Sequence, residues 1–267
     1  MVFMENQKVL KKIVFISLII SVLIISDLFS QPVVGLDNWF NHETDAKTGK
    51  PFHYLWTDSA FSGYSRWGEI FTSRGAKITT IAKPYPDVLK KLNIYIIVDP
   101  DTTTESPNPN YILSDDVASI KKWVEGGGVL AVLANDGPNC EFTHLNALMS
   151  QFGMRFNHVT LHPVTGDNFE MGASTNLPDH PLFKGVKKIY LKDISDINLS
   201  GTSKSILNEK GKVIIAENKF GKGYVFAIGD PWIYNEYIDH ERLPASFDNM
   251  KAAENLTGLL LSYTKKK

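Results

Sequence analysis

The chain has 267 residues, of which 43% are hydrophobic and 21% are charged, as in an ordinary globular protein. This composition excludes a disordered chain and a fibrous repeat. Its 28 Lys and Arg residues nearly balance its 29 Asp and Glu residues, and the net charge of −1 argues against a nucleic-acid partner held by overall charge. The single cysteine, Cys140, excludes an internal disulfide and a multi-cysteine zinc site.

The N-terminus carries a basic stretch and then an apolar run. Three lysines precede the run from Ile13 to Ile25, which is shorter than the ~20 residues that a membrane-spanning helix needs. This pattern is typical of a secretory signal peptide, and Ser30 supplies a small residue at a plausible cleavage point. We therefore expect residues 1–30 to be a signal peptide and residues 31–267 to be a periplasmic protein, without stable membrane association after cleavage. An uncleaved anchor is the alternative.

Hydrophobic patterning predicts alternating strands and helices from residue 31 onward. Short apolar runs predict strands, whereas apolar residues at helical spacing predict helices, several of which are followed by glycine. The predicted strands cover 33–36, 76–81, 94–98 and 129–134, and the predicted helices cover 58–74, 114–125, about 145–152 and a last stretch from near Ser246. Residues 212–218 and 223–229 are predicted to form a hairpin, and residues 154 to about 205 an antiparallel extension or a flap.

The strand composition indicates the fold class. The run Ile94–Val98 is apolar at every position, which suits a strand covered on both faces of a parallel sheet. Strands that alternate with helices predict a doubly wound, mostly parallel α/β sheet with an antiparallel extension. No repeat or linker divides the mature chain, so we expect residues 31–267 to form a single α/β domain.

Polar residues gather where such a sheet binds ligands, beyond the carboxyl ends of its strands. Predicted strands are followed by Asp37, Asp99, Asp136 and Asp230, each of which alone is readily explained as a turn former. Together with polar and aromatic neighbours, they indicate a shared pocket of the kind that binds sugars. The neighbours are Trp39, His42, Glu43, Asn135, Asn139, Glu141, His144, Trp232, Tyr234, Asn235 and Glu236.

Several known motifs are absent from the sequence. It has no phosphate-binding glycine loop of either common type, so we expect no nucleotide cofactor. His42 and Glu43 are not followed by a second histidine at metalloprotease spacing, and we expect no metal, although scattered histidines and strand-end acids leave such a site open. Cys140 lacks the flanking glycines of a nucleophile elbow, so we expect it to be dispensable.

Six segments carry a resemblance to a known family: 36–43, 52–54, 63–68, 98–102, 134–136 and 229–237. The chain resembles the class I glutamine amidotransferase-like superfamily with the elbow nucleophile lost. More specifically, it is similar to a domain found beside, or fused to, unsaturated glucuronyl and rhamnogalacturonyl hydrolases of Bacteroidetes. This group includes oligosaccharide dehydratases of ulvan degradation. The resemblance implies a glutamine amidotransferase-like or flavodoxin-like sheet.

The resemblance also implies a reaction: elimination of water from the non-reducing uronic acid of an ulvan-type oligosaccharide. The 4,5-unsaturated uronyl product is the form that an unsaturated glucuronyl hydrolase, the implied pathway partner, accepts. Such a step needs a partner for the substrate carboxylate, a base for the C5 proton and an acid for the C4 hydroxyl. We expect proton transfer by His53, His144 and Tyr64, although Tyr64 also suits the core, and carboxylate binding by Asn135, Asn139 and Arg66.

Two other classes of function remain open from sequence. A non-catalytic carbohydrate-binding module would use the same aromatic residues without proton transfer. A glycoside hydrolase would place two carboxylates on either side of the scissile bond. Mass spectrometry separates the three, because elimination removes one water, hydrolysis adds one and binding changes nothing. The sequence does not indicate the oligomeric state, the exact sugar or its linkage.

We predict that the exported protein begins at Gln31, since the basic stretch and the apolar run match a cleavable signal. Sequencing the N-terminus of protein recovered from the periplasm tests this expectation. A protein that retains Met1 and stays with the membrane fraction would show an uncleaved anchor instead.

Overall fold

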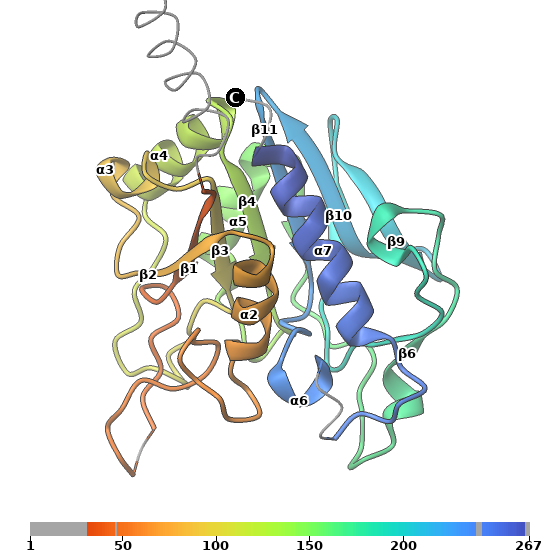
Figure 1. Cartoon of the computed structure of the whole chain (residues 1–267). Helices are drawn as coiled ribbons and strands as arrows, with labels where there is room; N and C mark the ends of the chain where they lie inside the picture. The colour runs from red at the N-terminus through yellow and green to blue at the C-terminus, as the bar shows by residue number, and fades with distance from the viewer. Residues whose placement is uncertain (1–30, 46, 239–241, 265–267) are drawn as a thin grey trace, which may run out of the picture. The chain divides into compact units, whose positions relative to one another are not determined.

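The computed structural model describes residues 31–45, 47–238 and 242–264. The signal peptide predicted for residues 1–30 lies outside these residues. From Pro32 onward the described chain belongs to one compact unit. Among its described residues, the unit is built on a seven-stranded sheet in the order β2-β1-β3-β4-β11-β10-β9 (Figure 1).

The sheet combines strands from both halves of the chain. Its strands are β1 (Val33–Asp37), β2 (Lys77–Ile81), β3 (Ile94–Val98), β4 (Val129–Leu133), β9 (Lys204–Glu209), β10 (Lys212–Phe220) and β11 (Gly223–Ile228). The α-helices are α2 (Ser65–Ser73), α3 (Pro86–Leu89), α4 (Ser114–Glu125), α5 (Phe142–Met149), α6 (Asn235–Ile238) and α7 (Asn249–Thr264). Two small antiparallel sheets in the described chain pair β5 (Met154–Phe156) with β8 (Ile197–Leu199) and β6 (Ala173–Ser174) with β7 (Ile189–Tyr190).

The β2-β1-β3-β4-β11 part of the sheet is parallel. Every residue of β3 and β4 is buried because helices cover both faces (Figure 1). Ile94 and Ile96 of β3 belong to a core cluster with residues of α2 and α7, whereas Tyr95 and Ile97 belong to a cluster with residues of α4 and α5. The predicted α/β class with a mostly parallel sheet is confirmed.

The antiparallel part of the sheet follows the parallel part. β10 and β11 pair antiparallel, as the predicted hairpin requires, and β9 adds a further antiparallel strand at the edge. Residues 154 to about 205, predicted as an antiparallel extension or flap, contain the two small sheets and two 3₁₀ turns within the described chain. This region lies between α5 and β9 in the sequence.

Helix boundaries differ from the sequence-based expectation in several places. The helix predicted from Asp58 begins only at Ser65, because the preceding residues form turns. The helix predicted over 114–125 coincides with α4, and the Asp116 carboxylate accepts the Leu113 amide at 3.0 Å. The four-residue helices α3 and α6 were not predicted, since so short an element gives no periodicity to detect. No helix in the described part of the chain has the length and apolar character needed to cross a bilayer.

Asn235, a predicted ligand-binding residue, holds the turn before α2. Its side-chain amide donates to the backbone oxygens of Asp58 at 3.1 Å and Ala60 at 2.9 Å, and its Oδ1 accepts the Arg66 amide at 3.0 Å. The residue is 2% exposed. A distant asparagine thus supplies the cap that the sequence around α2 lacks.

We predict that Asn235→Ala lowers the free energy of unfolding by roughly 2–3 kcal/mol, because it removes three hydrogen bonds between a buried side chain and partly buried backbone groups. Urea unfolding of both proteins measures the change. Asn139→Ala is the matched control, since Asn139 is exposed and donates to the Asp136 side chain. Equal losses in the two variants would contradict the structural role of Asn235.

Candidate functional site

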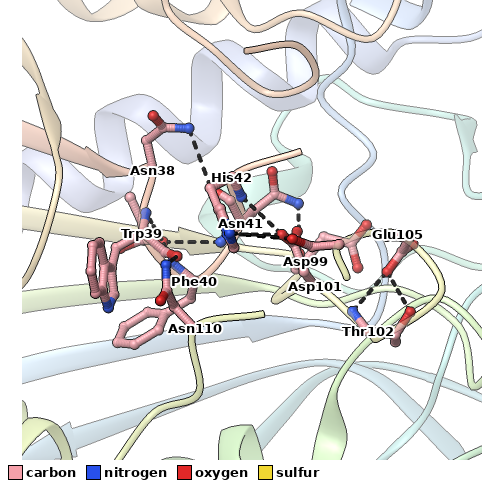
Figure 2. Close-up of polar contacts among 12 residues, drawn as sticks. Asn38, Trp39, Phe40, Asn41, His42, Asp99, Asp101, Thr102, Glu105 and Asn110 are labelled. Carbon is pink, nitrogen blue, oxygen red and sulfur yellow. Dashed lines mark hydrogen bonds and ion pairs between the residues drawn. The ribbon is translucent and has the colours of Figure 1, made fainter. Parts of the chain in front are cut away.

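The loops that follow β1 and β3 contact each other at the carboxyl edge of the sheet (Figure 2). The Asn41 amide donates to the backbone oxygen of Asp99 at 2.8 Å, and the Asp101 amide donates to that of Phe40 at 2.9 Å. β1 pairs with β2 on one side and with β3 on the other, and open α/β sheets bind ligands where neighbouring connections diverge in this way. We call the meeting point of these loops the strand-end site.

The Asp99 carboxyl group is buried directly after β3, with 2% of the residue exposed. Its Oδ2 accepts the Tyr54 hydroxyl at 2.7 Å and the Asn135 amide at 2.8 Å, whereas its Oδ1 has no hydrogen-bond partner among the described residues. Burial raises the pKa of Asp99 well above its ordinary value, and the nearby charge of Glu105 raises it further. Both effects favour the protonated form of the Asp99 carboxyl group.

Two tyrosine hydroxyls extend from Asp99. The hydroxyl of Tyr54 lies 3.2 Å from that of Tyr234, and their ring centroids are 5.6 Å apart. Burial raises the pKa of both tyrosines, so both hydroxyls keep their protons. Tyr234 is only partly buried. The chain Tyr234–Tyr54–Asp99 therefore runs from a partly buried tyrosine to a buried carboxyl group.

The backbone around this chain is strained. His53, Tyr54 and Asp99 have φ values of 63°, 48° and 40°, in the left-handed region that residues with side chains rarely adopt. Each such residue costs on the order of 1–3 kcal/mol, and such strain clusters at functional sites. Burial lowers the pKa of His53 to about 4, against the opposing charge of Asp58. The half-buried His53 ring is therefore neutral at neutral pH and able to accept a proton.

A second group of carboxyls lies beside Asp99 (Figure 2). Burial raises the pKa of Asp101 and that of Glu43 to about 7, and it also raises the pKa of Glu105. His42 Nε2 lies 3.2 Å from the Ser106 hydroxyl, whereas its Nδ1 lies 3.0 Å from Asp101 Oδ2 without hydrogen-bond geometry. Within the described residues, no three His, Cys, Asp or Glu side chains are arranged to hold a metal ion.

The loop after β4 completes the strand-end site. Asn135, which donates to Asp99, accepts the Asp136 amide at 2.9 Å. Asp136 in turn accepts the Asn139 amide at 2.7 Å and the Thr160 hydroxyl at 2.6 Å. Asp136 thus orders the loop that presents Asn135.

All four strand-end aspartates lie at one edge of the sheet, because β1, β3, β4 and β11 run parallel. Their side chains nevertheless have different contacts, and not all of them face the strand-end site. Asp37 accepts the Phe40 amide at 2.7 Å and the Tyr95 hydroxyl at 2.6 Å, and Asp230 accepts the Lys192 amide at 2.8 Å. Asp37 and Asp230 are buried loop organisers, so their side chains are not available to a ligand in this structure.

Other predicted residues pack into the core or cap helices. Tyr64 and Trp232 are both fully buried, and the Tyr64 hydroxyl donates to the backbone oxygen of Pro231 at 2.7 Å. Glu141 caps α5 by accepting the amides of Thr143 and His144. Tyr64 and Glu141 therefore have a sufficient structural explanation, whereas the buried indole N–H of Trp232 has no hydrogen-bond partner among the described residues.

The remaining predicted residues lie on partly exposed surface. The His144 ring stacks on Tyr111 with centroids 4.5 Å apart. Arg66 pairs with Glu69 at 3.2 Å, and Glu236 pairs with Arg242 at 3.1 Å. Trp39 is partly buried on the loop after β1, and Asn139 is exposed on the loop after β4.

Cys140 is 2% exposed. Burial raises the pKa of its thiol well above the ordinary value, and Asp99 raises it further. A protonated, buried thiol is a poor nucleophile, which agrees with the expectation that Cys140 is dispensable.

Sequence reasoning missed Tyr54, Asp101 and Glu105 as site residues. Tyr54 follows His53 directly, and Asp101 follows Asp99 after a single proline. Closeness in sequence to a predicted site residue could therefore have indicated both. Glu105 accepts the amide of Thr102 at 2.9 Å and closes the loop after β3. Nothing in the local sequence around Glu105 indicated that contact.

No protein-family model and no curated protein matches the chain. Among solved structures, the N-terminal domain of mmIFT52 is similar with a TM-score of 0.66 and 12% identity, over 86% of this chain and 97% of that one. The cytoplasmic protein STM1381 from Salmonella typhimurium LT2 is similar with a TM-score of 0.57 and 13% identity, over 89% of this chain and 100% of that one. A β-galactosidase from Rahnella sp. R3 gives 0.50 and 12%, over 87% of this chain and 31% of the enzyme. At these identities the likeness shows the fold alone.

We predict that the free energy of unfolding falls as pH rises from about 5 to about 8. The folded-state pKa values of about 7 for Asp101 and Glu43 lie above their unfolded values, so the folded protein binds more protons in this window. The fully buried side chain of Asp101 contributes roughly 1–3 kcal/mol of this loss. Urea unfolding at both pH values measures it.

Asp101→Asn should flatten that pH dependence, because the asparagine side chain does not titrate. Its side-chain oxygen can still accept the backbone N–H of His42. Asp87→Asn is the matched control, since the pKa of exposed Asp87 is lowered by Lys90 and lies below the window. A pH profile that Asp101→Asn leaves unchanged would contradict the raised pKa of Asp101.

Proposed function

We propose that the strand-end site binds the non-reducing uronic acid of an ulvan-type oligosaccharide and eliminates water from it as a carbon–oxygen lyase. The observation that carries this proposal is the Tyr234–Tyr54–Asp99 chain beside neutral His53, in strained backbone. It combines a group able to accept a proton with groups that hold protons, as an elimination requires. The resemblance of the loop motifs to those of oligosaccharide dehydratases supports the same reaction.

In this proposal His53 removes the C5 proton of the uronyl ring. The electrons of the C5–H bond form the C4=C5 double bond, and the C4–O bond breaks. Tyr234 donates its proton to the departing hydroxyl, which leaves as water. Tyr54 then turns to donate to Tyr234, and protonated Asp99 supplies the next proton, so the negative charge rests on Asp99. The proton on His53 returns to Asp99 through solvent, and the protein is restored.

Protonated carboxyls would also receive the substrate carboxylate. An ionised acidic cluster repels a uronate, whereas neutral Asp101 and Glu43 can donate hydrogen bonds to it, together with the Asn135 amide. Since the pKa values of Asp101 and Glu43 are about 7, substrate binding weakens as pH rises through 7. His42, which contacts Asp101, positions this carboxyl group.

The wider setting of this proposal follows from the sequence. We propose a doubly wound, glutamine amidotransferase-like or flavodoxin-like sheet, which the strand order and the helices on both faces support. The predicted signal peptide supports work in the periplasm. An unsaturated glucuronyl hydrolase would consume the product, and the proposed reaction needs no cofactor.

We predict that His53→Ala and Tyr234→Phe each lower turnover of an ulvan oligosaccharide by ~10²–10⁴-fold, the usual contribution of a general acid or base. Oligosaccharide binding should change little, because both groups act mainly on the reacting atoms. The ultraviolet absorbance of the unsaturated product measures turnover, and mass spectrometry confirms the loss of one water.

Tyr224→Phe is the matched control for Tyr234→Phe. It removes a hydroxyl that donates to Glu217 at 2.8 Å, near the opposite end of β11, and should leave turnover unchanged. If His144→Ala abolishes turnover while His53→Ala does not, the base is His144. A wild-type protein that binds the oligosaccharide without producing absorbance is a binding module, and one that shortens it by adding water is a hydrolase.

A further inference from the structure

A lysine lies between two aromatic rings beside the strand-end site. Lys83 Nζ is 5.3 Å from the ring centroid of Trp39 and 5.2 Å from that of Tyr85. Trp39 belongs to the loop after β1, and the other two residues belong to the loop after β2. These strands are parallel neighbours, so both loops leave the same edge of the sheet as Asp99. We call these three residues the aromatic–lysine patch.

The Lys83 ammonium group has no acidic partner within the described part of the chain. Its side chain is partly buried, yet no Asp or Glu oxygen of the described residues lies within ion-pair distance of Nζ. Neighbouring Lys90, by contrast, pairs with Asp87 at 2.6 Å. Cation–π contact holds the Lys83 ammonium group in place but does not neutralise its charge. The patch therefore offers an unpaired positive charge at a fixed position.

The backbone of the patch is rigid. Tyr85 is 57% exposed, which is unusual for a tyrosine, but it is flanked by Pro84 and Pro86 and its amide donates to the Lys83 oxygen at 2.9 Å. Trp39 is held through its own backbone, because its amide donates to Asp37 and its oxygen accepts the Asn110 amide at 2.9 Å. An exposed aromatic ring on a restrained backbone loses little conformational entropy when it binds a ligand.

The chemistry of the patch differs from that of the strand-end site. The rings offer flat apolar faces for the C–H surface of a sugar, and Lys83 offers an ammonium group for an anionic substituent. Figure 2 shows the Trp39 ring directed away from the side where Asp99, Asp101 and Glu105 lie. The patch is therefore a neighbouring subsite and is not part of the carboxyl cluster.

We propose that the aromatic–lysine patch binds a second, carboxylate-bearing sugar residue of the oligosaccharide whose terminal residue occupies the strand-end site. This inference rests on the proposed function and adds the substrate class: an anionic oligosaccharide longer than one sugar. The strands β2 and β3 lie on either side of β1, roughly 10 Å apart. A chain that spans both places thus needs more than one ring.

The test measures binding by calorimetry, which is independent of turnover. Wild type, Lys83→Met and Tyr85→Ala are titrated with a glucuronate-containing tetrasaccharide and with its methyl ester, in which the carboxylates are neutral. We expect each substitution to weaken tetrasaccharide binding about 5–10-fold, as loss of one charged or stacking contact does. Lys83→Met should have little effect on the methyl ester, whereas Tyr85→Ala should weaken binding of both ligands.

Lys83→Arg should restore most of the binding lost in Lys83→Met, since it keeps the charge. Lys90→Met is the matched control, because Lys90 is exposed and forms an ion pair with Asp87. The Lys90→Met variant should bind the tetrasaccharide as tightly as wild type does. If the wild type binds and turns over the tetrasaccharide, and Lys83→Met and Tyr85→Ala change neither binding nor turnover, the subsite alone is overturned. A wild-type protein that binds neither ligand would overturn both the subsite and the proposed function.

Discussion

The burial of one carboxyl group, that of Asp99, constrains the strand-end site. An ionised carboxylate without water is costly, so Asp99 must stay protonated or gather hydrogen-bond donors. Both effects are present, since Tyr54 and Asn135 donate to Oδ2 and burial raises the pKa. Those donors come from the connections after β1 and β4, and the connection after β1 also contacts the Asp99 backbone through Asn41. The left-handed conformations of the region are maintained because these contacts hold them together.

The same burial links the charge of the site to its shape. Asp101 and Glu43 also have raised pKa values, and both lie in loops that meet over Asp99. Protonated, these carboxyls can lie close to one another and to an anionic ligand; ionised, they repel both. The loops that form the site are therefore most stable in the charge state that suits an anionic substrate. Stability and ligand preference follow from one desolvation effect.

The strands and the shared edge were predictable because they depend on local composition. Strands buried on both faces are apolar throughout, as β3 and β4 are, and an aspartate after such a strand lies at its carboxyl end. What each aspartate contacts was not predictable. Asp99 and Asp230 each follow a buried strand and precede a proline, yet one accepts the Tyr54 hydroxyl and the other the Lys192 amide. Partners 45 and 38 residues away decide the difference, and nothing in the local sequence records them.

A near-neutral chain can still separate its charges over a short distance. The strand-end site gathers carboxyls after β1 and β3, whereas the loop after β2 presents Lys83 without an acidic partner among the described residues. If Lys83 paired with one of those carboxyls, that carboxyl would ionise and the lysine would no longer attract an anion. The Trp39 and Tyr85 rings hold the ammonium group through cation–π contact instead, which leaves its charge available. Because the Lys83 ammonium group lies against aromatic rings, the carboxyls stay protonated and the positive charge is kept. A uronate chain that occupies both subsites would need both conditions.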